Sequence, residues 1–390
     1  MEFAEFLAPF DAGVFRSQYY GKLPLHVRKT AAGQSLLPWA RFNEVLALTP
    51  YWNEETLKVY FKSRAALREN YCDTADLRPG APAPANAAKV KALMGLGASV
   101  VANQLHRVCP EVNVVAAMLE REFAARASAN VYCSFQGVQA FQTHFDLHDV
   151  FAVQAEGEKT WRIYESRADA PVNPVPPGDE WEKWLTDTRG KLLFEAQMRP
   201  GDVLYLPRGQ YHDALTGDVA SLHVSFGVQP ATGLALFKLL ESALTRESEF
   251  REYLPDARDA GALGARLDRL ADRVRAVMTS PAFAVDVSNH QRELSRPAAD
   301  YGLPARRPPA WYSVARRAQV LRRDGGFAVA FDGGEIAVGA NYPTIEWALK
   351  QRMFSVDDAL ARQPGIDRAA LVADLERLAK AGIIVETEMR

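Results

Sequence analysis

The chain has 390 residues, of which 48% are hydrophobic and 24% are charged. This composition is ordinary for a globular protein, and the length suggests two or three domains, at least one of them with a sizeable core. The formal net charge of −2 gives no overall attraction to nucleic acid or to acidic lipid.

The sequence contains three cysteines, Cys72, Cys109 and Cys133, and no Cys-x-x-Cys spacing. So small and odd a set argues against a disulfide framework and a zinc knuckle, and it favours a reducing, cytoplasmic environment. The N-terminus has neither a basic start nor a long apolar run, so we expect no signal peptide. No stretch of about 18 apolar residues occurs, so we expect no membrane span.

The first 130 residues mix helical and extended segments, with one helix expected within 87–102 and another at 119–127. Strand-like segments follow, separated by turns that contain glycine or proline. They lie at 131–135, 150–153, 159–164, 194–198, 203–206 and 221–228. The Glu156-Gly157-Glu158 turn predicts a hairpin between the second and third of these segments. Many short strands at this spacing predict a closed antiparallel β architecture.

An insertion with a Pro-rich loop and the pair Trp181 and Trp184 interrupts the strands between residues 171 and 195. After Gly233 the apolar residues recur with a helical period, which predicts helices whose apolar stripes serve core or subunit packing. Beyond residues 306–309 we expect a short helical stretch, a hairpin at 327–338, two or three helices that end near Gly382, and a last strand at 383–385.

The segment most informative for function is Thr143-His144-Phe145-Asp146. Residues two apart on a strand point to the same face, so His144 and Asp146 can direct an imidazole and a carboxylate to one point. His212, just after the Pro207-Arg208-Gly209 turn, supplies a second imidazole. Two histidines and one carboxylate on one side of a metal form the facial triad of non-haem iron(II) oxygenases. A His-x-Asp pair alone is a weak signal, but the strand-rich setting and the later histidine favour a metal site.

These residues carry a resemblance to the JmjC-type ribosomal oxygenases. The stretches that resemble this family are residues 143–164, 205–212 and 221–228, together with 20–25 near the N-terminus. The resemblance implies an α+β fold with three parts. A double-stranded β-helix (the JmjC or cupin barrel) with N-terminal helices would span 1–230, a helical dimerisation region 231–303, and a winged-helix-like domain 304–390. The residues just before His144, 135–142, depart from the family's pattern.

The resemblance also implies an Fe(II)/2-oxoglutarate-dependent oxygenase that hydroxylates an arginine or histidine side chain of a protein, with a ribosomal protein as the expected substrate. His144, Asp146 and His212 would hold the iron and would be the catalytic residues, and O2 would be the second co-substrate. The family's basic residue fifteen positions after the first histidine is Lys159 here, which would bind the distal carboxylate of 2-oxoglutarate. Independently of the family, a lysine on a strand opposite the metal segment is a suitable partner for such a carboxylate. Ser134 is the nearest candidate for a serine that assists in some members.

The resemblance further implies a homodimer. We expect no direct nucleic-acid binding, because thirteen basic and eleven acidic residues nearly balance from Arg306 to the end. Two other functions stay open: the same chemistry on a peptide natural product or small molecule, and a catalytically inert barrel that acts as a protein-binding module. His148 is open between a local hydrogen bond and a role at the metal or substrate. For His223 an interior histidine with its hydrogen bonds satisfied is favoured over a ligand.

Overall fold

The computed structural model describes residues 1–30, 36–48, 51–61, 64–73, 81–134, 142–172, 181–215, 217, 220–295, 310–362 and 365–387. The chain divides into two compact units, Met1–Ala298 and Ala299–Arg390. Of the predicted segments, most of the loop before His144, at 135–141, and the boundary at 303/304 lie outside the described residues.

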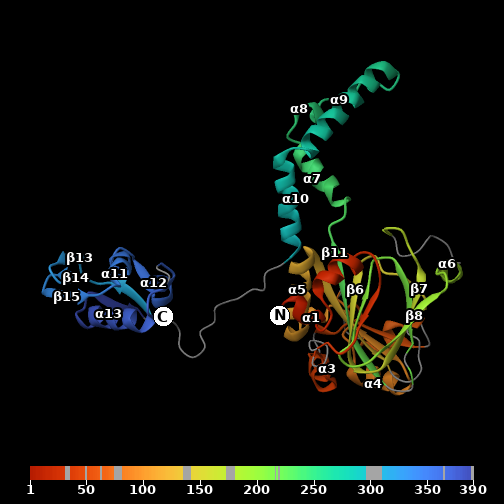
Figure 1. Ribbon diagram of the computed structural model, residues 1–390, viewed down its shortest axis with the longest axis horizontal. Coiled ribbons are helices and arrows are strands. Elements are labelled where there is room, and N and C mark those ends of the chain that lie inside the picture. The colour runs from red at the N-terminus through yellow and green to blue at the C-terminus, as the bar shows by residue number, and fades with distance from the viewer. Residues whose placement is uncertain are drawn as a thin grey trace. The chain divides into compact units, whose positions relative to one another are not determined.

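Two antiparallel sheets form the barrel of the first unit (Figure 1). In the described residues the larger sheet has the order β1-β9-β6-β11-β5-β4-β2-β3, and the smaller has the order β10-β7-β8. The strands of the larger sheet are β1 (Leu25–Val27), β2 (Leu57–Phe61), β3 (Arg64–Ala65), β4 (Ser99–Ala102), β5 (Ala125–Ser134), β6 (Asp149–Gly157), β9 (Val203–Leu206) and β11 (Ser221–Pro230). Those of the smaller sheet are β7 (Lys159–Arg167), β8 (Leu192–Met198) and β10 (Gln210–Leu215).

The hairpin predicted around the turn at 156–158 is wrong. β6 pairs with β9 and β11 in the larger sheet, whereas β7 pairs with β8 and β10 in the smaller one. The turn therefore carries the chain from one sheet to the other. Gly157 has a φ of +63°, and a Cβ there would lie 1.7 Å from the carbonyl oxygen of Ala220, so this crossing requires glycine.

Helices from the N-terminal part cover the outer face of the larger sheet. They are α1 (Phe3–Leu7), α2 (Ala12–Val14), a π-helical turn (Phe15–Tyr19), α3 (Trp39–Leu46), α4 (Ala87–Gly95) and α5 (Pro110–Phe123). Phe15 contacts Tyr205 of β9 with ring centroids 4.8 Å apart, and Phe3 contacts Phe151 of β6 at 6.0 Å. This aromatic core supports one wall of the barrel.

The two helices predicted in this part are present, but the first prediction also takes in the whole of β4 and the second the start of β5. The segment 87–102 is helical only to Gly95, and β4 begins at Ser99. α5 ends at Phe123 because Ala124 adopts a left-handed conformation with a φ of 46°, and β5 starts directly after it.

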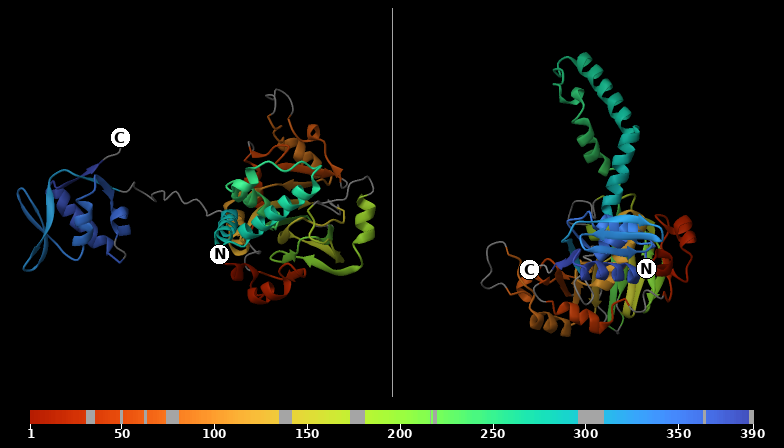
Figure 2. Two further views of the ribbon diagram at one scale, coloured as in Figure 1. Left: turned by 90° about the horizontal axis from the view of Figure 1, so that it is seen from above. Right: turned by 90° about the vertical axis from the view of Figure 1, so that its left-hand side faces the viewer.

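A helical arm projects from the end of β11, as Figures 1 and 2 show. It consists of α7 (Ala235–Leu244), α8 (Ser248–Arg251), α9 (Ala260–Met278) and α10 (Pro281–Leu294). These are the helices that the apolar period predicts after Gly233. Several of their large apolar side chains are exposed, among them Phe237 at 68% and Leu267 at 51%. The insertion between β7 and β8 contains a separate helix, α6 (Trp181–Thr188).

The second unit combines two small sheets with three helices in its described residues. Its elements are β12 (Trp311–Val314), β13 (Ala318–Arg323), β14 (Gly326–Phe331), β15 (Gly334–Val338), α11 (Tyr342–Ala348), β16 (Met353–Ser355), α12 (Val356–Arg362), α13 (Arg368–Lys380) and β17 (Ile384–Thr387). The sheets have the orders β16-β12-β17 and β13-β14-β15. The predicted hairpin, helices and last strand are present.

The short helical stretch expected at the start of this unit is wrong, because those residues form β12 and β13. β12 pairs with a strand on each side, β16 and β17, and this pairing decides its conformation over local propensity. In the described part of the chain, no helix has the length and apolar character needed to cross a membrane.

Candidate active site

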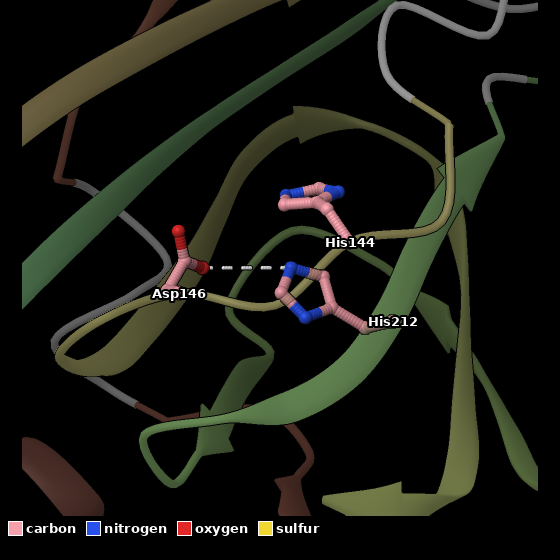
Figure 3. A group of neighbouring side chains, drawn as sticks. All are labelled: His144, Asp146 and His212. Carbon is pink, nitrogen blue, oxygen red and sulfur yellow. Dashed lines mark ion pairs between the residues drawn. The ribbon is translucent and has the colours of Figure 1, made fainter. Parts of the chain in front are cut away.

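The side chains of His144, Asp146 and His212 meet inside the barrel (Figure 3). His144 and Asp146 lie in the segment that leads into β6, and His212 lies on β10. One ligand atom from each residue falls within 4.8 Å of the others, and Asp146 Oδ2 is 3.6 Å from His212 Nε2. The three residues that the sequence pattern selected are therefore brought together in the geometry of a metal centre.

Backbone carbonyl groups orient both imidazole rings. Nδ1 of His212 lies 2.9 Å from the carbonyl oxygen of Gln210, and Nδ1 of His144 lies 2.8 Å from that of Gln142. A ring that donates from Nδ1 carries its lone pair on Nε2, which is the atom required by a metal ion. The two ligand segments are joined by one backbone bridge, in which the His144 and His212 amides donate to each other's carbonyl oxygens at 3.0 and 2.9 Å.

The Pro207-Arg208-Gly209 turn fixes the start of β10. Gly209 has a φ of +85°, and a Cβ there would lie 2.4 Å from the carbonyl oxygen of Ala168. Its amide donates to the carbonyl oxygen of Asp146 at 2.9 Å. The Arg208 amide donates to Oδ1 of the buried Asp149 at 2.7 Å. Asp149 therefore ties this turn to the start of β6.

The charges of the site suit a divalent metal. Burial, together with the neighbouring His144, lowers the pKa of His212 to about 4. Burial works against ionisation of Asp146, but the nearby histidines, His212 first, hold its pKa below the usual value. Near neutral pH His212 is thus an uncharged imidazole and Asp146 a carboxylate, the protonation states in which these groups bind metal. Two imidazoles and one carboxylate are a donor set that fits iron(II).

The triad lines a cavity of about 270 Å³ that also contains Lys159, at the start of β7. The lysine is only 4% exposed, and its Nζ is 3.5 Å from Ser134 Oγ, which in turn lies 3.2 Å from Ser99 Oγ. Lys159 forms no ion pair with any described carboxylate. Burial lowers its pKa to about 8. A buried ammonium without an anion is costly, so an anionic ligand in this cavity would complete the site.

Apart from His148 and His223, the rest of the cavity wall was not recognised in the sequence. Tyr132 and His223 stack with centroids 4.8 Å apart, and Trp161 stacks on His212 at 5.6 Å. His223 is interior, as expected, but its buried Nδ1 has no hydrogen-bond partner in the described structure, so the expectation of a satisfied ring is wrong. Strand alternation is the signal that points to these positions, because Ser128, Asn130 and Tyr132 of β5 all line the cavity.

His148 also lines the cavity, without belonging to the metal group found among the described residues. Its Nδ1 lies 3.2 Å from the carbonyl oxygen of Asp149. The imidazole rests on Gly227 of β11, where a Cβ would approach His148 Cε1 to 2.7 Å. His148 thus occupies space that a larger residue at 227 would take.

A closed antiparallel barrel with two histidines and an aspartate in its cavity defines the cupin class of fold, with the ligand set of non-haem iron oxygenases. More particularly, the family model described as "JmjC domain" matches residues 103–236. This part of the chain therefore matches a JmjC domain, and the fold is an α+β fold of the JmjC/cupin type.

Curated relatives agree with this assignment. The chain is 38% identical over 144 residues to the "Bifunctional lysine-specific demethylase and histidyl-hydroxylase NO66" of Dictyostelium discoideum, an alignment that covers 35% of this chain and 27% of that protein. It is 35% identical over 149 residues to "Ribosomal oxygenase 1" of Danio rerio, covering 36% and 27%. The chain thus spans about a quarter of the length of these relatives. The predicted resemblance to the JmjC-type ribosomal oxygenases is confirmed.

A solved structure of YcfD, described as a ribosomal oxygenase from Escherichia coli in complex with cobalt and 2-oxoglutarate, aligns with 97% of this chain and 99% of that chain. The identity is 15% and the TM-score is 0.49.

Proposed function

We propose that this protein is an Fe(II)/2-oxoglutarate-dependent oxygenase that hydroxylates an amino-acid side chain of a protein. The observation that carries the proposal is the presence, in one cavity, of a His-Asp-His triad and a buried lysine that has no anionic partner among the described residues. The triad fits the metal, and Lys159 fits the distal carboxylate of the co-substrate. Together they define a site for a metal chelated by a small dicarboxylate.

Each residue then has a defined task. His144, Asp146 and His212 would hold the iron, and Lys159 with Ser134 would bind the distal carboxylate of 2-oxoglutarate by a charge-assisted contact. Iron(II) and 2-oxoglutarate supply the oxidising chemistry, in which O2 is consumed and the co-substrate leaves as succinate and CO2. The wall around the proposed position of the metal and the co-substrate is formed by Tyr132, Trp161 and His223, which exclude water. The chain's contribution is to position the reactants.

For the substrate we propose an arginine or histidine side chain of a ribosomal protein. The names of the relatives support this, since they include a ribosomal oxygenase and a histidyl-hydroxylase. The cavity supports a side chain as the target, because its wall near β5 and β11 offers the small polar residues Ser128, Asn130 and Ser225.

The experiment is a turnover assay followed by mass spectrometry. The purified protein with Fe(II), O2 and 2-oxoglutarate should release succinate, and proteins from cells that contain it should gain one oxygen on a defined peptide. His144→Ala is the control and should do neither. Succinate release without any modified protein would favour a peptide natural product or small molecule as substrate. A protein without turnover that still binds a partner would favour the inert binding module.

We also propose that the helical arm joins two copies of the chain. α7 has no buried residue in one copy, and the exposed Phe237 and Leu267 offer apolar surface to a second copy. The second unit, with its helices and hairpin, we propose to be winged-helix-like and not to bind nucleic acid. A cytoplasmic location likewise stays a prediction, which fluorescence imaging of the tagged protein would test.

A further inference from the structure

A buried carboxylate lies directly behind the metal centre and is not part of the proposed chemistry. Asp213 follows the ligand His212 on β10, and its side chain is 2% exposed. Its Oδ2 accepts hydrogen bonds from Thr143 Oγ1 at 2.9 Å and from the Tyr164 hydroxyl at 2.6 Å. Its Oδ1 lies 3.0 Å from Nε of Arg162.

Arg189, the residue after α6, completes this group. It donates to Thr143 Oγ1 at 2.8 Å and to the Tyr164 hydroxyl at 3.0 Å, and its guanidinium lies 4.5 Å from the centre of the Tyr164 ring. We call the five residues Thr143, Arg162, Tyr164, Arg189 and Asp213 the Asp213 cluster. A buried carboxylate is costly unless it is paired and hydrogen-bonded, and here Oδ2 accepts two hydrogen bonds while Arg162 and Arg189 lie within 3.0 and 3.9 Å of the two carboxylate oxygens.

The position of the cluster relative to the ligands follows from the strand register. His144 and His212 are opposite each other in the backbone bridge. Thr143 precedes His144 and Asp213 follows His212, so Thr143 and Asp213 are the next opposite pair in an antiparallel register. Side chains alternate between faces, so the histidines point into the cavity while Thr143 and Asp213 meet on the far side of the same bridge.

Among the described residues, three backbone hydrogen bonds join these two segments: the two of the bridge, and the one from the Gly209 amide to the Asp146 carbonyl oxygen. His144↔His212 is an isolated bridge, flanked by no further ladder pair between the two segments among the described residues. The Thr143–Asp213 hydrogen bond is the side-chain contact directly behind it. On its other side, β10 pairs Asp213 with Arg162 of β7, so the carboxylate connects both neighbours of β10.

The cluster also reaches the insertion. α6 packs behind the ligand segments through buried Leu185, which contacts Phe145 and Tyr211, the neighbours of His144 and His212. The Thr188 hydroxyl lies 2.9 Å from the Tyr211 hydroxyl, and Arg189 then enters the cluster. The insertion is therefore attached to the back of the metal centre at two adjacent places.

From this arrangement we infer that Asp213, through Thr143, is a positioning residue that sets the separation of the two histidine ligands. It touches neither metal nor substrate. The inference rests on the proposed function only in so far as the triad binds a metal. Loss of the contact lets the two ligand segments separate, so the variant protein binds metal more weakly.

The test is an anaerobic titration of the full chain with Co(II), followed by the visible absorption of the bound ion, which reports its coordination geometry. Thr143→Val removes the hydroxyl at constant shape and should weaken Co(II) binding by roughly 10-fold or more, as loss of groups that support metal ligands does. Thr143→Ser keeps the hydroxyl and should bind as the wild type. Asp213→Asn should weaken binding by about 10- to 100-fold and change the band.

Asp202→Asn is the matched control. Asp202 is equally buried, at 3%, and accepts from the Lys29 amide at 3.0 Å and the Arg199 amide at 3.1 Å, away from the metal centre. The Asp202→Asn variant should have a lower melting temperature than the wild type and the same Co(II) affinity. Equal Co(II) affinity in Thr143→Val and wild type, or a loss of affinity in Thr143→Ser or Asp202→Asn as large as that in Thr143→Val, would overturn the inference. Wild-type protein that binds Co(II) but turns over no 2-oxoglutarate would overturn the proposed function and leave this comparison standing.

Discussion

Replacing Lys159 by methionine removes the ammonium from the cavity with little change of volume. The side chain is 4% exposed, and its Nζ lies 3.5 Å from Ser134 Oγ. If the ammonium pairs with the distal carboxylate of 2-oxoglutarate, the variant leaves that carboxylate buried without a partner. Breaking a buried pair in this way costs about 3–5 kcal/mol, so the Kd for 2-oxoglutarate should rise by more than about 100-fold.

The same lysine predicts a pH dependence. Burial lowers the pKa of Lys159 to about 8, so the protein without ligand loses this positive charge as the pH rises through that value. The dianion binds the protonated form. The Kd should therefore be flat below about pH 7 and should rise by roughly tenfold per pH unit above pH 8, until the higher pKa of the complex is reached. Lys159→Arg keeps its charge throughout and should show no such rise.

Anaerobic calorimetric titration of the Co(II)-loaded protein with 2-oxoglutarate measures these constants. Retained Co(II) absorption in Lys159→Met serves as the control for an intact metal centre. A Kd for 2-oxoglutarate that is unchanged by Lys159→Met, or that is constant between about pH 6 and pH 10 in the wild type, would refute this reasoning.

Three further results are expected. His212→Ala should lose bound metal and 2-oxoglutarate turnover, and removing the metal from the wild type with a chelator should have the same effect. Adding Fe(II) should restore bound metal and turnover only in the wild type, as measured by metal analysis and succinate release. Gly157→Ala, at a φ of +63° and 1.7 Å from the Ala220 carbonyl oxygen, should lower the free energy of unfolding by about 1–3 kcal/mol or more in urea denaturation, and an unchanged midpoint would contradict the tight crossing. Phe237→Glu places a charge on an apolar side chain that is 68% exposed in one copy, and should shift sedimentation from dimer to monomer; a wild-type monomer would contradict the proposed interface.

The metal ligands could be predicted from the sequence because their signal is local. His144 and Asp146 need only the two-residue period of an extended segment, and His212 needs only the glycine-containing turn before it. The same local reasoning failed at 156–158. Two strand-like segments joined by a short turn give the same sequence pattern whether they pair with each other or belong to two facing sheets. Only contacts distant in sequence, such as Gly157 against Ala220, distinguish the two.

Residues whose role depends on the register of strands were not recognisable. Tyr132 lines the cavity because β5 turns its even-numbered residues inward, and this is fixed by pairing with β11, about 90 residues further along the chain. Asp213 reads in the sequence as an ordinary polar residue after a histidine. Its burial among Thr143, Tyr164 and two arginines appears only when β10 lies between β7 and the ligand segment.

The carbonyl groups that orient His144 and His212 have a consequence for how such a centre can change over time. Every amino acid has a carbonyl oxygen, so a substitution at residue 142 or 210 does not by itself remove the group that holds each ring. The tautomer of the two ligands is encoded by the path of the main chain and not by side-chain identity. The metal centre can therefore be retained when many of the residues beside it are substituted, provided that the turn at Gly209 keeps its shape.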